Sequence, residues 1–583
     1  MMGRSPTAAA AAAAALAADT AHGDPAIWIH RIADDDVLEA AARLEREGAR
    51  ERPLWGVPFA VKDNIDVAGL PTTAGCPAYA YVPGHSAPVV ERLLAAGALL
   101  LGKTNLDQFA TGLSGVRSPY GVPRNVFDAA LVPGGSSSGS ACAVAAGIVP
   151  FALGTDTAGS GRVPAMFGNV VGFKPTIGSF SSTGVVPACR SIDTISIFAR
   201  SVDEALAVAR VAAGYDDRDR YSRRAPLAHL RRGGAGGSGR VAVGAALPSC
   251  AEHVQAGYAA AAAMFETVPV DLAPFLAIAR LLYDGPWVAE RTAALRAFAE
   301  AAPERLHPVT WAILQSGLER TAVDTFDALH AVAAARRLAE QMFRDVDALL
   351  VPTAPFCPSL QECAADPIGP NSRLGTFTNF VNLCDLAAIA VPAGVGPDGL
   401  PAGVTLVGPA WSDGRLAALA DRIHRRLATT VGATGRPLPD PGLTEDGAAE
   451  DVGADETALF CVGAHLSGLG LNHQLRERGG RLIRVSRTAP RYRLYAMGTR
   501  PGLVGVPEGG VAIAGEVWAL PTSAIGGLLA LVPPPLGFGT VSLEAGSCLG
   551  FLAESAAVAD AIDISQHGGW RAWLAASQLA PTM

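Results

Sequence analysis

Three short segments of this sequence carry side chains that could together perform nucleophilic catalysis. They are WGVPFAVKD, which includes Lys62, the serine-rich GGSSSGSA, which includes Ser136, and GTDTAGSGRVP. A buried lysine near serine hydroxyls has a lowered pKa and can act as a general base where no histidine is available. The small residues Ala158, Gly159 and Ser160 allow backbone N–H groups to converge on one point, as an oxyanion hole requires. We therefore expect Lys62, Ser136 and Ser160 to act as one set.

The serine-rich stretch has three other interpretations, all less favoured. A disordered linker would be exposed, whereas apolar runs flank GGSSSGSA on both sides and no charge interrupts it. A phosphate-binding P-loop needs a G-K-[ST] that is missing here. Residues 135–139 match G-x-S-x-G, which would nominate Ser137 as an α/β-hydrolase nucleophile. However, no buried strand leads directly into that match, and no histidine follows it before His229.

Lysine is rare in this chain. Only three of the 46 lysine and arginine residues are lysines: Lys62, Lys103 and Lys174. Because the sequence uses arginine where only positive charge is needed, a retained lysine marks a position that needs a compact ammonium group or one able to lose its proton. For Lys103 and Lys174 simple packing explains the lysine equally well, and both interpretations stay open.

An α/β layer is expected to position the three segments, because strand-like apolar runs alternate with helical ones. Helical spacing is expected over 35–50, 87–97 and 141–149. Strands are expected over 55–63, 98–105 and 151–159, the last ending in a glycine-rich turn. Lys62 thus falls at the end of one strand and Ser160 just after another.

The rest of the chain divides into segments that differ in hydrophobic periodicity and composition. Residues 203–345 have mostly helical spacing, then sheet-like runs return in DALLVPTAP, LAAIAVPAG and AGVTLVG, and a helix closes this unit. Residues 433–456 are rich in Pro, Gly and acidic side chains, which predicts a linker. Short strand-like runs, LLALVP among them, follow. We predict a catalytic domain over 1–432 and an α+β domain over 457–583.

Length and composition restrict the class of protein. A chain of 583 residues predicts two or three domains. The net charge of −8 argues against nucleic acid or an anionic membrane as the main partner, and no apolar stretch could span a bilayer. Nine scattered cysteines and the lack of H-E-x-x-H indicate a cytoplasmic protein with reduced thiols and no metal site. The alanine-rich start is expected to be a frayed or helical lead rather than a signal peptide.

Four motifs, AVKDN, GGSSSGSACAVAAG, GTDTAGSGRVPA and VVGFKPT, make residues 25–430 resemble the amidase signature family. The resemblance implies an α/β domain with a mixed β-sheet covered by helices. It implies Ser160 as nucleophile, Ser136 as a relay serine preceded by a cis peptide bond, and Lys62 as general base. The oxyanion hole would be formed by the backbone amides of Thr157, Ala158, Gly159 and Ser160. Many members carry glycine in place of Ala158, but the backbone donor is the same.

Two further segments, SSTGVVPACRSIDTISIFARS and LLYDGPWVAERTAALR, resemble the allophanate hydrolases of that family. Tyr283 and Arg291 stand eight residues apart, which on one helix returns both to nearly the same face. By the resemblance, Arg291 grips a substrate carboxylate and Tyr283 adds a hydrogen bond. Without it, a surface arginine and a core tyrosine would be the simpler interpretation. The implied substrate is allophanate, urea bearing a carboxylate, cleaved to ammonia and N-carboxycarbamate.

The segments FCVGAHLSGLGLNHQL, YRLYAMG, AIAGEVWALP and GGWRAWL resemble the second domain of allophanate hydrolases, which has a γ-glutamylcyclotransferase-like fold. The resemblance implies that this domain speeds the breakdown of N-carboxycarbamate to ammonia and carbon dioxide. His465, in the small-residue turn GAHLSG, is the first candidate for acid/base chemistry, although a lone histidine is as often structural. Glu516 and His473 are weaker candidates.

The resemblance implies no cofactor. The chain has no lysine after Lys174, so no later lysine is present to carry a biotinyl group. The chain is therefore expected to act beside a separate urea carboxylase or triazine-degrading enzymes, and a homodimer fits the resemblance. Two alternatives remain. One is an amidase of the same family that acts on another fatty, aryl or glutaminyl amide, and the other is a non-catalytic, carboxylase-associated scaffold.

Overall fold

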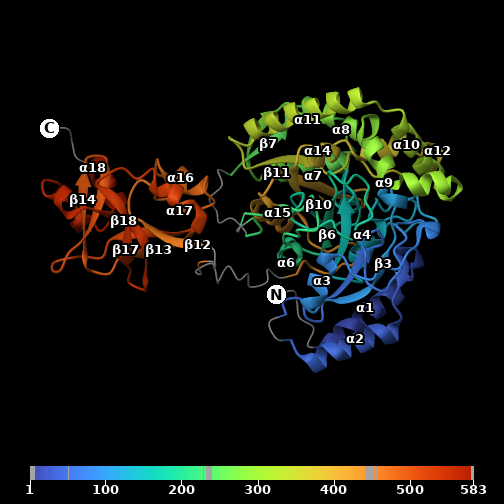
Figure 1. The fold of residues 1–583 in the computed structure, drawn as a ribbon, viewed down its shortest axis with the longest axis horizontal. Coiled ribbons are helices and arrows are strands. Elements are labelled where there is room, and N and C mark those ends of the chain that lie inside the picture. Colours follow the sequence, from blue (N-terminus) through green and yellow to red (C-terminus); the bar gives the residue numbers. More distant parts are fainter. Residues whose placement is uncertain are drawn as a thin grey trace. The chain divides into compact units, whose positions relative to one another are not determined.

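The computed structural model describes residues 7–49, 52–226, 229–231, 239–439, 452 and 456–578. The chain forms two compact units, a larger one made of residues 1–232 and 237–442 and a smaller one made mainly of residues 443–583 (Figure 1). Most of the predicted linker lies outside the described residues. No described helix has the length and apolar character needed to cross a membrane, and no three described His, Cys, Asp or Glu side chains are grouped as metal ligands would be.

A mixed sheet of 11 strands runs through the larger unit, as predicted. In order across the sheet the strands are β1 (Trp28–Arg31), β3 (Leu99–Thr104), β2 (Pro58–Lys62), β4 (Phe151–Asp156), β6 (Thr194–Ala199), β5 (Val171–Lys174), β10 (Leu386–Val395), β11 (Pro401–Pro409), β9 (Ala348–Pro352), β7 (Arg240–Gly244) and β8 (Glu266–Val270). β2 and β7 are each parallel to both of their neighbours, whereas every pair from β4 to β9 is antiparallel. Helices cover both faces, so inner strands such as β2 and β4 are buried along their whole length and are mainly apolar.

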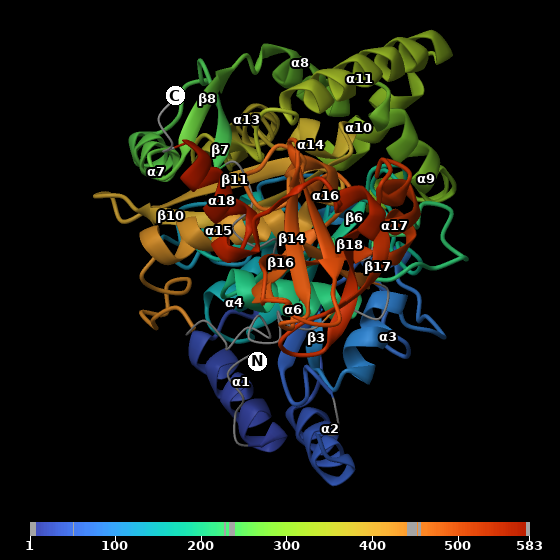
Figure 2. The same ribbon diagram turned by 90° about the vertical axis from the view of Figure 1, so that its left-hand side faces the viewer.

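The helices of the larger unit are α1 (Ala8–His22), α2 (Asp34–Glu47), α3 (Pro88–Ala95), α4 (Ser138–Ala145), α5 (Val163–Phe167), α6 (Val202–Ala212), α7 (Glu252–Ala262), α8 (Ala273–Asp284), α9 (Trp287–Ala301), α10 (Pro308–Leu318), α11 (Ala322–Met342), α12 (Leu360–Ala365), α13 (Gly369–Leu374), α14 (Asn379–Leu383) and α15 (Asp413–Leu427). The alanine-rich start forms α1, which packs against α2 (Figure 2). Thr7 caps α1, and Ala8 and Ala12 are fully buried, so the start is helical as expected.

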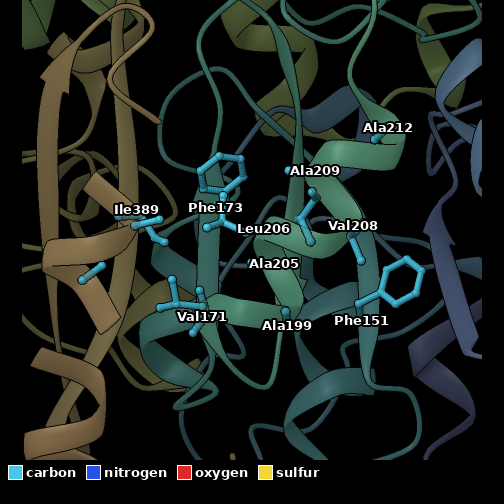
Figure 3. Close-up of a cluster of buried hydrophobic side chains, with 14 of the residues drawn as sticks. Phe151, Val171, Phe173, Ala199, Ala205, Leu206, Val208, Ala209, Ala212 and Ile389 are labelled. Atoms are coloured by element: carbon cyan, nitrogen blue, oxygen red, sulfur yellow. The ribbon is translucent and has the colours of Figure 1, made fainter. Parts of the chain in front are cut away.

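Strand β4 shows how the two faces are buried. Phe151 and Leu153 belong to a hydrophobic cluster with Leu206 of α6, whereas Ala152, between them, belongs to another cluster with Val144 of α4. Figure 3 shows the first of these clusters. Successive strand side chains point to opposite faces, so this alternation packs β4 on both sides. The carboxyl end of β4, which leads into the GTDTAGS segment, is thereby anchored in the core.

The smaller unit is α+β. Its five-stranded sheet has the order β13 (Arg481–Arg487), β16 (Ala514–Pro521), β12 (Glu456–Cys461), β18 (Ser547–Ala553) and β17 (Leu536–Ser542). A second sheet has the order β15 (Arg500–Gly505), β14 (Tyr492–Met497) and β19 (Ile562–Asp563). The helices are α16 (Asn472–Arg476), α17 (Thr522–Leu529) and α18 (Trp570–Gln578). A separate core that includes Phe460 and Trp518 holds these elements together.

Three sequence-based expectations need correction. The mostly helical stretch 203–345 also contains β7 and β8, which lie at one edge of the large sheet. The segment LLALVP begins inside α17 and is not a strand, because a short apolar run cannot be assigned from periodicity alone. Tyr283 and Arg291 do not share one helix: α8 ends before Gly285 and Pro286, which break the helix, and α9 follows.

Candidate active site

The carboxyl ends of β2 and β4 meet at one edge of the large sheet, because these neighbouring strands are parallel. Lys62 is the last residue of β2, and Thr155 and Asp156 end β4. Helix α4 packs against both strands, and the residues at its start are Ser136 and Ser137. The fold therefore brings together three segments that are widely separated in the sequence. The carboxyl edge of parallel strands is a common place for ligand sites.

The Lys62 amine is fully buried and surrounded by hydroxyl groups. Its Nζ lies 2.7 Å from Ser136 Oγ, 2.9 Å from Ser137 Oγ and 2.8 Å from Thr155 Oγ1. Three hydroxyls match the three donors of an ammonium group; after deprotonation, two donors remain and the lone pair faces one hydroxyl. The Gly135–Ser136 peptide bond is cis, as the resemblance implied.

Burial lowers the pKa of Lys62 from its usual value near 10.5 to about 7. The carboxylates of Asp107, Asp156 and Asp193 oppose this shift, and Arg291 adds to it. A substantial fraction of Lys62 is therefore neutral at neutral pH, the state that can accept a proton from Ser136.

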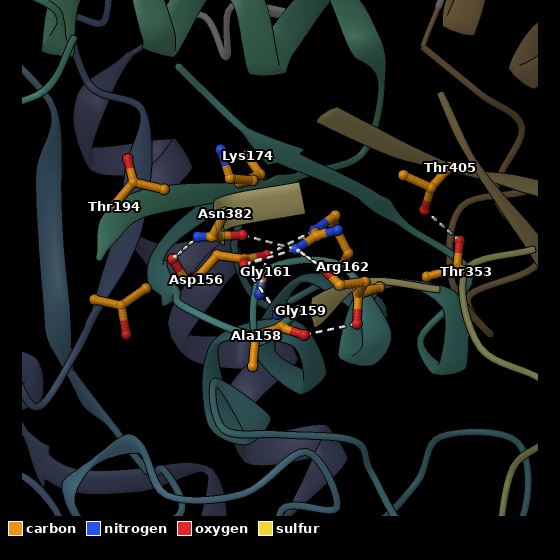
Figure 4. A network of polar contacts seen from close by, with 12 residues as sticks. Asp156, Ala158, Gly159, Gly161, Arg162, Lys174, Thr194, Thr353, Asn382 and Thr405 are labelled. Carbon is orange, nitrogen blue, oxygen red and sulfur yellow. Dashed lines mark hydrogen bonds and ion pairs between the residues drawn. The ribbon is translucent and has the colours of Figure 1, made fainter. Parts of the chain in front are cut away.

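Ser160 is buried in the turn that follows β4. The Asp156 carboxylate holds this turn together (Figure 4). Asp156 accepts hydrogen bonds from the backbone N–H groups of Gly159 at 2.9 Å and Gly161 at 3.0 Å. The Arg162 guanidinium binds both oxygens of the same carboxylate at 2.9 Å. Burial alone would raise the pKa of Asp156, but Arg162 outweighs it and lowers that pKa, so the clamp is a charged pair.

Further side chains fix the outside of this turn. Thr378 Oγ1 donates to the Ala158 carbonyl at 2.6 Å, and Asn382 Nδ2 donates to the Asp156 carbonyl at 2.8 Å. Thr157 Oγ1 donates to Asp193 at 2.5 Å. Burial raises the pKa of Asp193 to about 6. The turn that carries Ser160 is thus held by side chains from distant parts of the chain.

The four amides predicted to form an oxyanion hole differ in their hydrogen bonding. Among the described residues, the amides of Thr157, Ala158 and Ser160 have no hydrogen-bond acceptor, whereas the Gly159 amide is already bound to Asp156. The Gly159 amide, predicted as an oxyanion-hole donor, instead donates to Asp156 and holds the turn together. Nor does a hydrogen bond join the hydroxyls of Ser136 and Ser160 within the described ranges. Catalytic hydrogen bonds commonly tighten only when substrate binds.

Arg291 and Tyr283 meet across the break between α8 and α9. The Arg291 guanidinium carbon lies 5.7 Å from the centre of the Tyr283 ring. Arg291 is buried, whereas Tyr283 is half-buried. Arg291 Nη1 donates to Thr111 Oγ1 at 2.7 Å, whereas Nη2 has the Cys189 sulfur, at 4.0 Å, as its partner among the described residues. The Tyr283 hydroxyl is buried and has no hydrogen-bond partner in the same described part of the chain. A buried cation and an unpaired hydroxyl side by side suit a small anion.

The two other lysines have structural contacts. Lys103 forms a buried ion pair with Asp63 at 2.9 Å. Lys174 Nζ donates to the carbonyls of Pro175 at 2.9 Å and Leu386 at 2.7 Å. These contacts favour the packing interpretation for both, and Lys62 alone of the three faces the serines.

In the smaller unit the two histidine candidates differ. His465 Nε2 lies 3.1 Å from Gln474 Oε1, and its ring stacks on Phe551 with centroids 4.7 Å apart. Burial lowers the pKa of His465, so the ring is mostly neutral at neutral pH. His473 is exposed, with Nδ1 2.9 Å from the Gly470 carbonyl. His465 is therefore the better placed of the two for proton transfer.

Glu516 has a carboxylate that binds three other side chains. It accepts the backbone N–H and the hydroxyl of Ser467 at 2.8 and 3.0 Å, and the indole N–H of Trp518 at 3.0 Å. Arg571 of α18 adds an ion pair at 2.9 Å. Because Ser467 lies in the same turn as His465, Glu516 holds that turn in place.

The sequence reasoning missed several residues that build the site. Asp156 and Arg162 stand inside the quoted segment GTDTAGSGRVP, and an acid and an arginine six residues apart in a glycine-rich turn could have pointed to a clamp. Ser137 was weighed only as an elbow nucleophile, yet its hydroxyl binds Lys62 and the backbone of Thr155. Asp193 is far away in the sequence, and nothing local marked it.

Comparison with known proteins agrees with this geometry. Residues 11–417 match the family model of amidases, and residues 457–575 match that of the allophanate hydrolase C-terminal domain. The structure of Kluyveromyces lactis allophanate hydrolase is 38% identical, with a TM-score of 0.82, and the match covers 98% of this chain and 97% of that one.

Two curated relatives widen the comparison. The urea amidolyase of Saccharomyces cerevisiae is 41% identical over 94% of this chain, but this chain spans only 31% of its length. One component of the glutamyl-tRNA(Gln) amidotransferase of Symbiobacterium thermophilum is 36% identical over 71% of this chain and 91% of its own length. This second relative does not match the full length of this chain, whereas the allophanate hydrolase aligns with both units. The chain therefore belongs to the amidase family and, within it, to the allophanate hydrolases that carry this C-terminal domain.

Proposed function

We propose that this protein hydrolyses allophanate to ammonia and carbon dioxide. The observation that carries the proposal is the pair formed by Arg291 and Tyr283: a buried guanidinium with one nitrogen lacking an oxygen partner, beside a buried hydroxyl without any partner among the described residues. Leaving a buried hydroxyl unpaired costs about 1–3 kcal/mol. The carboxylate of allophanate would satisfy both groups, whereas a neutral amide would leave Arg291 without its counter-charge.

The catalytic steps follow from the groups around Lys62. Neutral Lys62 accepts the proton of Ser136, which accepts the proton of Ser160. Ser160 Oγ attacks the terminal carbamoyl carbon of allophanate, and the amides of Thr157 and Ala158 and that of Ser160 itself stabilise the oxyanion. The relay returns a proton to the departing ammonia. Water then hydrolyses the acyl-enzyme by the same route and releases N-carboxycarbamate.

The smaller unit acts on the product in this proposal. His465 supplies the acid/base group, and Glu516 and Arg571 hold its turn in position. Loss of carbon dioxide from N-carboxycarbamate leaves carbamate, which separates into ammonia and a second carbon dioxide. One allophanate thus yields two ammonia and two carbon dioxide molecules.

A homodimer is the proposed assembly. Four large apolar side chains on α10 and α11 are between 47% and 68% exposed: Leu318, Val323, Phe326 and Leu329. Val323, Phe326 and Leu329 follow one another at three-residue spacing on α11, and exposed apolar side chains that gather in this way are typical of interaction surfaces. We expect light scattering to give twice the chain mass, and Phe326→Glu to give a monomer; a wild-type monomer would refute the assembly.

A cytoplasmic location, with allophanate supplied by a separate urea carboxylase or by triazine degradation, fits the nine free thiols.

The test is ammonia release by the purified full chain. Allophanate is the substrate, and acetamide, malonamate and glutamine are the controls. We expect release from allophanate to exceed that from acetamide by at least about a hundredfold, because acetamide has no carboxylate for Arg291. Glutamine carries its carboxylate farther from its side-chain amide and should also be a poor substrate. Malonamate carries a carboxylate and an amide at nearly the same spacing as allophanate, so its rate measures what the central N–H of allophanate contributes. Activity on a neutral amide with none on allophanate would favour the family alternative, and no activity on any amide would favour the scaffold.

A further inference from the structure

A tight turn over residues 108–111 contacts Arg291, of the proposed substrate-binding pair Arg291 and Tyr283, and adjoins the loop that carries Ser136, here called the serine loop. Phe109 and Ala110 have φ values of 53° and 54°, in the left-handed region that residues other than glycine seldom adopt. Both are buried. Two such residues in succession persist only where the surroundings fix them, and they are concentrated at functional sites.

This turn directs three oxygen acceptors at one nitrogen of Arg291. Nη1 donates to Thr111 Oγ1 at 2.7 Å, to the Ala110 carbonyl at 3.3 Å and to the Phe109 carbonyl at 3.5 Å. The Thr111 hydroxyl in turn donates to the Phe109 carbonyl at 3.2 Å. Thr111 is thus both an acceptor for the guanidinium and a donor to its own turn. Nη2, beside the Cys189 sulfur, is left to meet a ligand oxygen.

The same turn is tied to the loop that carries Ser136. The residue before it, Asp107, donates its backbone N–H to the Ser136 carbonyl at 3.1 Å. The Asp107 carboxylate accepts the amides of Gly115 at 3.0 Å and Arg117 at 2.8 Å. Arg117 Nη1 donates back to the Thr111 carbonyl at 2.9 Å. The turn is therefore bound at both of its ends and has little freedom to shift.

We propose that Thr111 is a positioning residue for substrate binding: its hydroxyl and the left-handed turn hold Arg291 by one edge, so that the other edge faces the substrate carboxylate at a fixed distance from the serine loop. This inference rests on the proposed function. It adds a residue that touches no substrate and acts through Arg291. The substrate carboxylate is present in both the ground state and the transition state. Loss of the Thr111 hydroxyl, which weakens the grip of Arg291 on that carboxylate, should therefore weaken substrate binding more than it slows turnover.

Three substitutions of Thr111 distinguish the effect of its hydroxyl group from the effect of its side-chain volume. Thr111→Val keeps the shape but removes both hydrogen bonds, Thr111→Ala removes them without any chance of overpacking, and Thr111→Ser keeps them. Thr310→Val is the matched control, since the Thr310 hydroxyl is equally buried and has no partner among the described residues. Steady-state kinetics on allophanate with the full chain, together with thermal unfolding, are measured for all four.

We expect Thr111→Val and Thr111→Ala to raise KM about tenfold, the loss of one hydrogen bond to a charged group, with kcat within about twofold. Thr111→Ser restores KM to within about threefold of the wild type, and Thr310→Val changes neither constant. An unchanged KM in both Val and Ala variants overturns the inference, as does a fall in kcat alone or a failure of serine to restore KM. A wild-type enzyme without activity on allophanate instead refutes the proposed function, which distinguishes the two failures.

Discussion

In the larger unit the candidate polar groups are buried with hydrogen-bonding capacity to spare, whereas in the smaller unit Glu516 has several partners, His473 is exposed and His465 is half-buried. Three amides around Ser160 and the Tyr283 hydroxyl lack a partner among the described residues. Glu516, by contrast, accepts from Ser467, Trp518 and Arg571, and His473 lies at the surface.

This difference shows how a site and its support can be told apart. Unpaired buried donors lower the stability of the free protein, and a ligand that pairs with them restores that stability. A carboxylate that already has several protein partners, such as Glu516, stabilises the fold and has little capacity left for a substrate. Within the smaller unit, His465 is the candidate that keeps a neutral ring and a half-buried position, and Glu516 is its support.

The largest effect is expected from Ser160→Ala. Removing the Ser160 hydroxyl, the proposed nucleophile, leaves the clamp of Asp156 and Arg162 intact, so the protein should fold normally while kcat on allophanate falls by at least about a thousandfold. Ammonia release and thermal unfolding are measured on the same sample. A variant that keeps ordinary turnover would exclude Ser160 as nucleophile.

The second effect is the pH dependence set by Lys62. In the proposed mechanism the neutral amine of Lys62 is the base, so we expect activity to be lost as the pH falls through its pKa of about 7 and the amine is protonated. Below that value kcat/KM should fall about tenfold per pH unit, with a plateau above about pH 8. Lys62→Arg, which cannot deprotonate, should be inactive throughout. A flat profile between about pH 6 and 8 would contradict this role.

Tyr283→Phe should separate binding from stability. If the Tyr283 hydroxyl donates to the substrate carboxylate as proposed, its removal should raise KM for allophanate about tenfold. Because that hydroxyl has no partner in the free protein among the described residues, the melting temperature should not fall. A drop of several degrees with an unchanged KM would make Tyr283 a core residue instead.

The smallest effects are expected in the smaller unit. Glu516→Gln loses the charge that pairs with Arg571, and should destabilise this unit by about 2 kcal/mol while leaving allophanate consumption unchanged. His473→Ala, at an exposed position, serves as the control and should change nothing. His465→Asn should lower the ammonia produced per allophanate consumed without unfolding the unit. If His473→Ala had that effect and His465→Asn did not, the two histidines would exchange roles.

The local motifs predicted much of the larger unit. The strands that carry Lys62 and precede Ser160, and the cis peptide bond before Ser136, agree with the sequence-based expectations. The prediction failed where local pattern carries little information. Gly285 and Pro286 divide the helix that was expected to align Tyr283 and Arg291, and the two residues still meet because α8 and α9 pack together.

The sequence by itself determined which chemical groups are available: one lysine at a strand end, serines in two small-residue turns, and an arginine near a tyrosine. Residue type and local spacing suffice for that, because they set hydrogen-bonding capacity and turn geometry. Only the tertiary structure decided the state of those groups. Burial by distant segments lowers the pKa of Lys62, Asp156 occupies the Gly159 amide, and Thr111 fixes one edge of Arg291. Desolvation and hydrogen-bond competition depend on what the fold brings near, which no local pattern contains.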